Sequence, residues 1–394
     1  MKKIVGILAV AALFATSVFA VDISARVVQK GSIAGGVEDG DTYFLGIGKT
    51  HQKDGDLVEF SSSTDNAGAS FRLWADFDND EPVKVRYLSF WFKPIDMLKI
   101  TIGRSAPGLF TEKIDWWKIG TGVHIEDYNG WGGPGRYSSA VIGDGYGVNF
   151  ELKPIDGLTV GAQFIPGAGK AFFTKPNSGD ATYAAWGVMA KYQVTDAISA
   201  GAAYRDNGKD SWKQARFGIG YNGAFEGWLC GTMLMNEKAK DSGLDAVVID
   251  NYFSMGLGFM NLQARVPVTI RIADKEGSVK GYYKDANGQD QPYFWGKDSS
   301  YLVYNIKASF PQDGWTPYVQ IQSIDLDDDG TYNACGTMHQ AIRLDDFKFN
   351  TSIHLGASFN VGAVGLDVAG VVNIDTADGA KMGWYIPFIA SMSL

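Results

Sequence analysis

The sequence predicts an all-β fold, a closed antiparallel transmembrane β-barrel of about 18 strands, within a range of roughly 16 to 18. Three observations predict it. Apolar and polar residues alternate with a period of two, the alternating segments run for about 9 to 12 residues, and short connections alternate with long ones. A soluble sandwich also alternates, but its strands are usually about 5 or 6 residues long.

The chain begins with MKKIVGILAVAALFATSVFA, in which two lysines precede an apolar stretch and small residues follow it. This order is typical of a secretory signal peptide with cleavage after Ala20, and the apolar stretch is shorter than the roughly 20 residues of a spanning helix. We expect residues 1–20 to be the signal peptide and residues 21–394 to form one outer-membrane β-barrel domain, since no Pro/Ser-rich linker divides them.

Charge and cysteine content narrow the function further. The formal net charge is −9, and it becomes −11 when Lys2 and Lys3 leave with the signal peptide. An acidic exported protein is a poor candidate for nucleic-acid binding. Two cysteines, Cys230 and Cys335, do not make a disulfide framework in so long a chain, and the sequence leaves their pairing open.

The alternating segments have one apolar face and one face too polar for a packed core. The longest example places Leu262, Ala264, Val266, Val268, Ile270 and Ile272 on one face and Gln263, Arg265, Thr269 and Arg271 on the other. A polar face of this kind is expected in a water-filled barrel interior. Aromatic residues near the predicted strand ends, Trp228 and Trp315 among them, fit interfacial girdles.

We expect strands at these segments, of which 42–62 is broken and is either one interrupted strand or two: 22–33, 42–62, 67–77, 83–93, 98–104, 144–153, 158–165, 183–193, 198–206, 213–222, 226–235, 250–260, 262–273, 300–310, 315–326, 349–360, 363–374 and 382–394. The short connections between them suit periplasmic turns and the long polar ones suit outer loops, which are 105–144, 166–181, 236–250, 274–300 and 327–348. An even strand number then leaves the N- and C-termini on the periplasmic side.

The tetrapeptide KPID occurs twice between alternating runs, at 93–96 and at 153–156. Proline has no N–H to donate and fixes φ, so we expect it where a strand stops, with Asp capping the reversal. The two segments are therefore predicted to be periplasmic hairpin turns rather than a solenoid repeat.

With its signal peptide, strands such as GYGVNFELKPIDGLTVGAQF and KYQVTDAISAGAAYRDNG, and the final YIPFIASMSL, the chain resembles bacterial outer-membrane porin-type β-barrel proteins. The usual last residue of such barrels is Phe, whereas this chain has Leu394. Trimeric porins fold a long outer loop into the barrel, so the resemblance implies a pore constriction at 105–144, or a loop packed over the rim. Its acidic candidates are Glu112, Asp115, Glu126 and Asp127.

Basic residues on the polar faces would lie opposite that loop. They are Arg104, Arg205, Arg216, Arg265, Arg271 and Lys307. A charge on the lipid face costs roughly 2 to 4 kcal/mol at mid-membrane, so we expect these side chains to point into the lumen. There they would set ion selectivity or form salt bridges that steady the wall.

The sequence evidence for a metal site or a catalytic site is weaker. Asp325, Asp327 and Asp329 match the first half of a calcium loop, but Gly336 stands where its bidentate Glu is needed, so a solvated loop and a weak Ca²⁺ site both stay open. We expect no other cofactor. The four histidines form no metal or catalytic motif, which argues against an enzyme, although His354 lies on a strand that could face the lumen.

The sequence thus predicts a porin, a passive diffusion channel for small hydrophilic solutes and ions, embedded in outer-membrane lipid. Porin resemblance leaves a homotrimer open. A second interpretation is substrate-specific uptake, with Trp116, Trp117, Trp131 and Tyr137 as a stacking surface. A third, from another class, is a surface adhesin or structural barrel whose loops bind host or envelope components.

Overall fold

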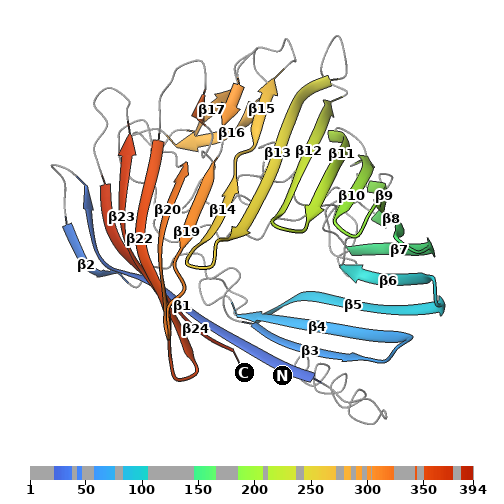
Figure 1. Ribbon diagram of the computed structural model, residues 1–394, viewed down its shortest axis with the longest axis horizontal. Helices are drawn as coiled ribbons and strands as arrows, with labels where there is room; N and C mark the ends of the chain where they lie inside the picture. Colours follow the sequence, from blue (N-terminus) through green and yellow to red (C-terminus); the bar gives the residue numbers. More distant parts are fainter. Residues whose placement is uncertain are drawn as a thin grey trace.

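A computed structural model gives the structure of this chain (Figure 1). It describes residues 22–37, 42–46, 57–75, 83–104, 146–165, 185–206, 212–236, 244–271, 279–284, 290–294, 300–302, 304–323, 342–343, 350–375 and 383–393. The signal peptide predicted at 1–20 and most of the predicted outer loops lie outside these ranges. No helix in the described part of the chain is long and apolar enough to cross a membrane.

All regular elements of the described residues are strands. In chain order they are β1 (Asp22–Val37), β2 (Thr42–Gly46), β3 (Leu57–Ser63), β4 (Ala67–Ala75), β5 (Val83–Ile95), β6 (Leu98–Arg104), β7 (Tyr146–Ile155), β8 (Leu158–Ile165), β9 (Ala185–Gln193), β10 (Ile198–Asp206), β11 (Trp212–Asn222), β12 (Glu226–Asn236), β13 (Leu244–Gly256), β14 (Asn261–Arg265), β15 (Val268–Arg271), β16 (Val279–Lys284), β17 (Asp290–Phe294), β18 (Ser300–Leu302), β19 (Asn305–Ser309), β20 (Trp315–Ser323), β21 (Ile342–Arg343), β22 (Asn350–Val361), β23 (Val364–Asp375) and β24 (Gly383–Ser393). Apart from the small β16–β17 hairpin, they form one 22-stranded antiparallel sheet.

The strand pairing closes this sheet on itself. Each strand pairs with the next one in the chain from β3 to β13. Strand β13 then pairs with both β14 and β15, β14 pairs with β19, β15 with β18, β18 with β21, β19 with β20, and β20 with β22. Strands β22, β23 and β24 follow in order, and β24 pairs with β1 from Arg26↔Ser393 to Val37↔Gly383. The other edge of β1 pairs with β2 and β3, so the described strands close into a ring (Figure 1). Four positions in the ring are each shared by two consecutive segments, namely β2 with β3, β14 with β15, β18 with β19, and β20 with β21, so the 22 described segments occupy eighteen positions. The predicted antiparallel barrel of about 18 strands is confirmed.

Several predicted boundaries were wrong. The strand predicted at 250–260 is β13, which begins at Leu244 and ends at Gly256, so the second half of the predicted loop 236–250 is strand. The strand predicted at 262–273 divides into β14 and β15 around Val266 and Pro267, because proline cannot donate a ladder hydrogen bond. The predicted loops 274–300 and 327–348 contain the β16–β17 hairpin and β21.

Both KPID segments form the same structure. The pairing register shifts between Phe92 and Ile95 in one hairpin and between Leu152 and Ile155 in the other, so each Lys-Pro pair makes a β-bulge. The strands then continue through Ile95 and Ile155, which face Leu98 and Leu158 across the turn. The predicted hairpins are confirmed, but proline lies in the bulge before the strand end rather than stopping the strand.

Successive short turns are joined by backbone hydrogen bonds. The amide of Lys93 donates to the carbonyl of Asn66 at 2.7 Å, that of Lys153 to Met97 at 2.8 Å, and that of Gln193 to Gly157 at 2.9 Å. Strands β1 and β24 end beside the same turns, since Asp22 pairs with Ser61 and Met392 with Val364. One end of the barrel thus carries both the described short turns and the outer ends of the first and last strands.

The two faces of the wall are the reverse of those of a soluble barrel. Along β11 Arg216 is 1% exposed while its neighbour Phe217 is 58% exposed, and along β22 His354 is 0% exposed while Leu355 is 63% exposed. Because the ring is closed, the buried polar face is the enclosed one and the apolar face looks outward. Large apolar side chains on the outside and polar ones inside are the pattern of a membrane-spanning barrel.

Candidate functional site

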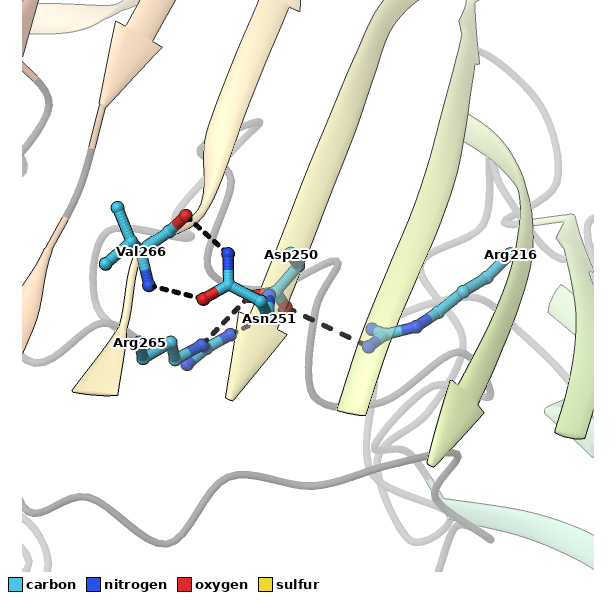
Figure 2. Close-up of polar contacts among 5 residues, drawn as sticks. All are labelled: Arg216, Asp250, Asn251, Arg265 and Val266. Atoms are coloured by element: carbon cyan, nitrogen blue, oxygen red, sulfur yellow. Dashed lines mark hydrogen bonds and ion pairs between the residues drawn. The ribbon is translucent and has the colours of Figure 1, made fainter. Parts of the chain in front are cut away.

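The enclosed face of strands β11 to β14 carries a buried group of three charged side chains, shown in Figure 2. Asp250 on β13 accepts hydrogen bonds from Nε and Nη2 of Arg265 at 3.0 and 2.9 Å. Nη2 of Arg216, reaching across from β11, lies 3.8 Å from the Asp250 carboxylate. All three side chains are 0% exposed, so water does not screen their charges in this structure.

An indole ring lies beside this ion cluster. The guanidinium carbons of Arg216 and Arg265 are 5.5 and 5.7 Å from the centre of the Trp228 ring, within the range of cation–π contacts. Trp228 is only 8% exposed and tilts against Tyr252 at 6.2 Å. The prediction that Trp228 belongs to an interfacial girdle was wrong, because its place on β12 puts it on the enclosed face between two cations.

The strand break at Val266 and Pro267 is repaired by a side chain. The Asn251 carboxamide donates to the carbonyl oxygen of Val266 at 2.7 Å and accepts from its amide at 3.0 Å (Figure 2). These are the bonds that a neighbouring backbone would make in an unbroken ladder. Asn251 therefore holds β13 and β14 in register beside Asp250 and Arg265.

A row of polar residues that pair directly on successive strands continues the enclosed face from the ion cluster. Arg265 pairs directly with Asn305, Asn305 with Gln322, and Gln322 with Ser352. The row therefore crosses β14, β19, β20 and β22. Within it, Nε2 of Gln320 donates to both Asn305 Oδ1 and Gln322 Oε1, each at 3.1 Å. These three amide side chains are 0% exposed.

Nearer the short turns the enclosed face carries a second chain of contacts. Nζ of Lys307 lies 4.2 Å from the centre of the Tyr318 ring. The Tyr318 hydroxyl donates to Asp367 Oδ1 at 2.7 Å, and Ser358 donates to Oδ2 of the same carboxylate at 3.0 Å. The Tyr318 ring covers Gly356, its direct partner on β22, where any Cβ would lie 2.4 Å from the ring.

The structure brings together some of the predicted basic residues and not others. Arg216 and Arg265 share Asp250, whereas Lys307 lies farther along the wall, against Tyr318. Arg205, on β10, pairs with Gln214 and follows the buried Ala203 on the same face. The backbones of Arg104 and Arg271 pair with Tyr146 and Ala246, and their side chains lie outside the description.

The remaining predicted site residues fall outside the described residues. They are the acidic loop candidates Glu112, Asp115, Glu126 and Asp127, the aromatic candidates Trp116, Trp117, Trp131 and Tyr137, and the calcium candidates Asp325, Asp327 and Asp329. Within the described ranges, no group of three or more His, Cys, Asp and Glu side chains could hold a metal ion. Cys230 is a buried free thiol, and Cys335 lies outside the description.

Sequence reasoning did not single out Asp250, which stood at the boundary between the predicted loop 236–250 and the predicted strand 250–260, nor the amide residues Asn251, Asn305, Gln320 and Gln322. His354, considered for the lumen, does face it, with Nε2 at 2.6 Å from Ser352 Oγ. The sequence does contain a pattern that could have placed two of these amides on the enclosed face. Gln320 and Gln322 alternate with Val319 and Ile321, so two amides repeat on one face of a membrane-length strand.

No protein-family model and no curated protein matches this sequence. Solved structures do match over nearly the whole chain. Pseudomonas aeruginosa OpdL is 11% identical, with 96% of this chain and 99% of that chain covered at a TM-score of 0.54. Pseudomonas aeruginosa OccK3 (OpdO) is 12% identical, with 95% and 94% covered at 0.52, and the outer membrane protein opdK from Pseudomonas aeruginosa is 12% identical, with 95% and 99% covered at 0.51. The chain has the fold of a porin-type outer-membrane β-barrel.

Proposed function

We propose that this protein is an outer-membrane porin through which small hydrophilic solutes and ions diffuse passively. The observation that carries the proposal is the closed ring of strands with a polar enclosed face and an apolar outer face. Bilayer hydrocarbon accepts only strands whose backbone groups are all paired, which a closed ring provides. Ionic and amide side chains on the inner wall suit passage of hydrated solutes rather than a packed core.

The location follows from the same features. Porin-type barrels place short turns in the periplasm, and here the short turns lie at the end where β1 begins and β24 ends. We therefore infer periplasmic termini and outer loops on the far side. The inward constriction by 105–144 and the homotrimer remain parts of the proposal that rest on porin resemblance alone.

Conductance tests the channel. Refolded protein added to a planar lipid bilayer should give discrete current steps, and its migration in a gel should change on heating, as a folded barrel requires. Folded, heat-modifiable protein that inserts but passes no current would contradict the porin and leave the adhesin interpretation. Deleting 130–135 should enlarge the steps if the long loop narrows the pore.

The ion cluster makes the charge preference testable. Two arginines contact one carboxylate at this level of the wall, so changing either sign of charge here should alter the ion preference of the channel. Replacing Asp250 by Asn should move the reversal potential in a salt gradient toward anions, and replacing Arg216 by Gln should move it toward cations. Asp206→Asn, which removes a carboxylate near Lys213 on the β10–β11 hairpin, serves as the control.

Selective uptake is the second channel hypothesis, and one comparison favours it. A solved structure of Pseudomonas aeruginosa OpdK with vanillate is 10% identical to this chain, with 95% of this chain and 98% of that chain covered at a TM-score of 0.51. The ordered, buried side chains of the wall would suit recognition better than unselective flow. Recording the ionic current with added vanillate distinguishes the two channel hypotheses. A current blocked by micromolar vanillate would support selective uptake, and a current unchanged by millimolar vanillate would favour general diffusion.

A further inference from the structure

The enclosed wall holds an array of three neutral amides beside the ion cluster. Asn305 and Gln322 are direct cross-strand partners on β19 and β20, and Gln320 is two residues before Gln322 on the same face. Side chains of directly paired residues lie about 4.5 to 5.5 Å apart at Cβ. Their carboxamides are therefore near enough to contact one solute together.

The hydrogen bonds within the array determine which groups are left to act. Nε2 of Gln320 donates to the oxygens of both Asn305 and Gln322, and a carboxamide nitrogen has two hydrogens to give. Both neighbouring oxygens are thereby occupied. Among the described residues, Asn305 Nδ2 and Gln322 Nε2 have no protein acceptor, although both side chains are 0% exposed.

Two neighbouring buried N–H donors without an acceptor among the described residues are unusual. The nearby charges belong to other contacts: Asp250 lies against Arg265 and Arg216, and Lys307, the direct partner of Gln320, lies against the Tyr318 ring. The array thus presents oriented donors without a net charge of its own. Such donors recognise the hydroxyl and carbonyl oxygens of uncharged solutes.

We propose that Asn305, Gln320 and Gln322 form an uncharged subsite on the lumenal wall that binds polyhydroxylated neutral solutes. The proposal rests on the channel function above and adds a ligand class to it. Hydroxyl oxygens accept from Asn305 Nδ2 and Gln322 Nε2, and Gln320 holds the two donors in orientation. The ion cluster is a separate site one strand away, where charge rather than hydrogen bonding governs passage.

Mannitol is the test probe, because an uncharged polyol that stays in the lumen interrupts the ionic current. Single-channel recordings with millimolar mannitol should show brief blockades in the unmodified protein. The double variant Asn305→Leu with Gln322→Met keeps side-chain size while removing both donors. Its blockades should be shorter by about 25-fold, at roughly fivefold for each hydrogen bond lost.

A second buried amide pair provides the matched control. Asn149 and Gln163 are direct partners on β7 and β8, and both are 4% exposed on the enclosed face. Asn149→Leu with Gln163→Met should leave the mannitol blockades within about twofold of the unmodified protein. Heat-modifiable gel migration confirms that each variant folds before recording.

Three outcomes would overturn the subsite. These are conducting channels that mannitol never blocks, blockades unchanged in the Asn305/Gln322 variant, and equal shortening in the Asn149/Gln163 control. Failure of the proposed channel function would give a different result, namely folded protein that passes no current at all. Gluconate, which carries a carboxylate on a similar hydroxylated chain, should lose less dwell time in the Asn305/Gln322 variant because the arginines still attract it.

Discussion

Asp250 and Arg265 are joined by two parallel hydrogen bonds across β13 and β14, while Arg216 approaches the same carboxylate from β11, two strand positions away. The carboxylate thus lies between two guanidinium groups that would otherwise repel each other inside a closed wall. A bidentate arginine contact also fixes orientation, which a single contact does not. This arrangement makes the ion cluster both a structural tie and a source of field in the lumen.

Asp250→Asn should destabilise the barrel strongly, because it removes the carboxylate that two buried guanidinium groups contact. Removing one partner of a buried ion pair costs about 3 to 5 kcal/mol. Urea unfolding in lipid vesicles, followed by tryptophan fluorescence, measures the loss. Asp206→Asn should cost less than about 1 kcal/mol, since Asp206 and Lys213 are 3.7 Å apart with side chains 18% and 28% exposed. Equal losses in the two variants would show that burial adds nothing to the Asp250 contact.

Asn251→Leu should loosen the wall at the strand break without changing any charge. The leucine fills a similar volume but leaves the amide and carbonyl of Val266 without their partners, at a cost of about 1 to 3 kcal/mol. Hydrogen exchange at the Val266 amide should accelerate, while exchange at Ala264, held by ladder pairing with Phe253, should not. Unchanged exchange at Val266 would mean that another group satisfies this amide.

Gly157→Ala should weaken the β7–β8 hairpin. Gly157 has a φ of +79°, and an added Cβ would lie 3.3 Å from both Cβ and the carbonyl oxygen of Gln193. The left-handed conformation costs a non-glycine residue roughly 1 kcal/mol, which urea unfolding can resolve. Gly370→Ala is the control, because a Cβ there meets nothing within 4 Å. If Gly370→Ala were the more costly change, the turn geometry would not explain the effect.

Leu355→Arg distinguishes a membrane barrel from a water-soluble one. Leu355 is 63% exposed on the outer face, so arginine there would be harmless in water. In a bilayer, arginine costs up to about 2 to 4 kcal/mol near the midplane and much less near the interface. The folded fraction in vesicles, read from heat-modifiable gels, should fall for Leu355→Arg but not for Ile155→Arg at the short-turn end. Full folding of both variants would contradict the lipid-facing assignment.

The sequence predicted the architecture well because period-two alternation reports directly which side of a wall each residue faces. It failed where alternation is interrupted. Val247, Val248 and Ile249 are consecutive apolar residues, and Val248 is completely buried on the enclosed face, so β13 appeared to start later than it does. Alternation also cannot show that Pro267 divides a strand whose apolar period continues on both sides.

The candidate site was predictable only in part. Arg216 and Arg265 could be assigned to the lumen, because a charge on the opposite face would meet lipid. Their common partner could not, since Arg216 and Asp250 lie on strands separated by β12, and their meeting depends on two successive registers, Arg216↔Thr232 and Thr232↔Val248. Small register changes would move Asp250 out of reach without altering the hydrophobic pattern.

The pairing of β1 with β24 has a consequence for how the protein reaches its final form. These two strands are more than 300 residues apart in the chain, yet they share a ladder from Arg26 to Val37. A nascent chain that lacks the last strand would keep two unpaired edges, both available to other chains. Closure through this ladder therefore requires both the first and the last strand, so it cannot precede the synthesis of β24.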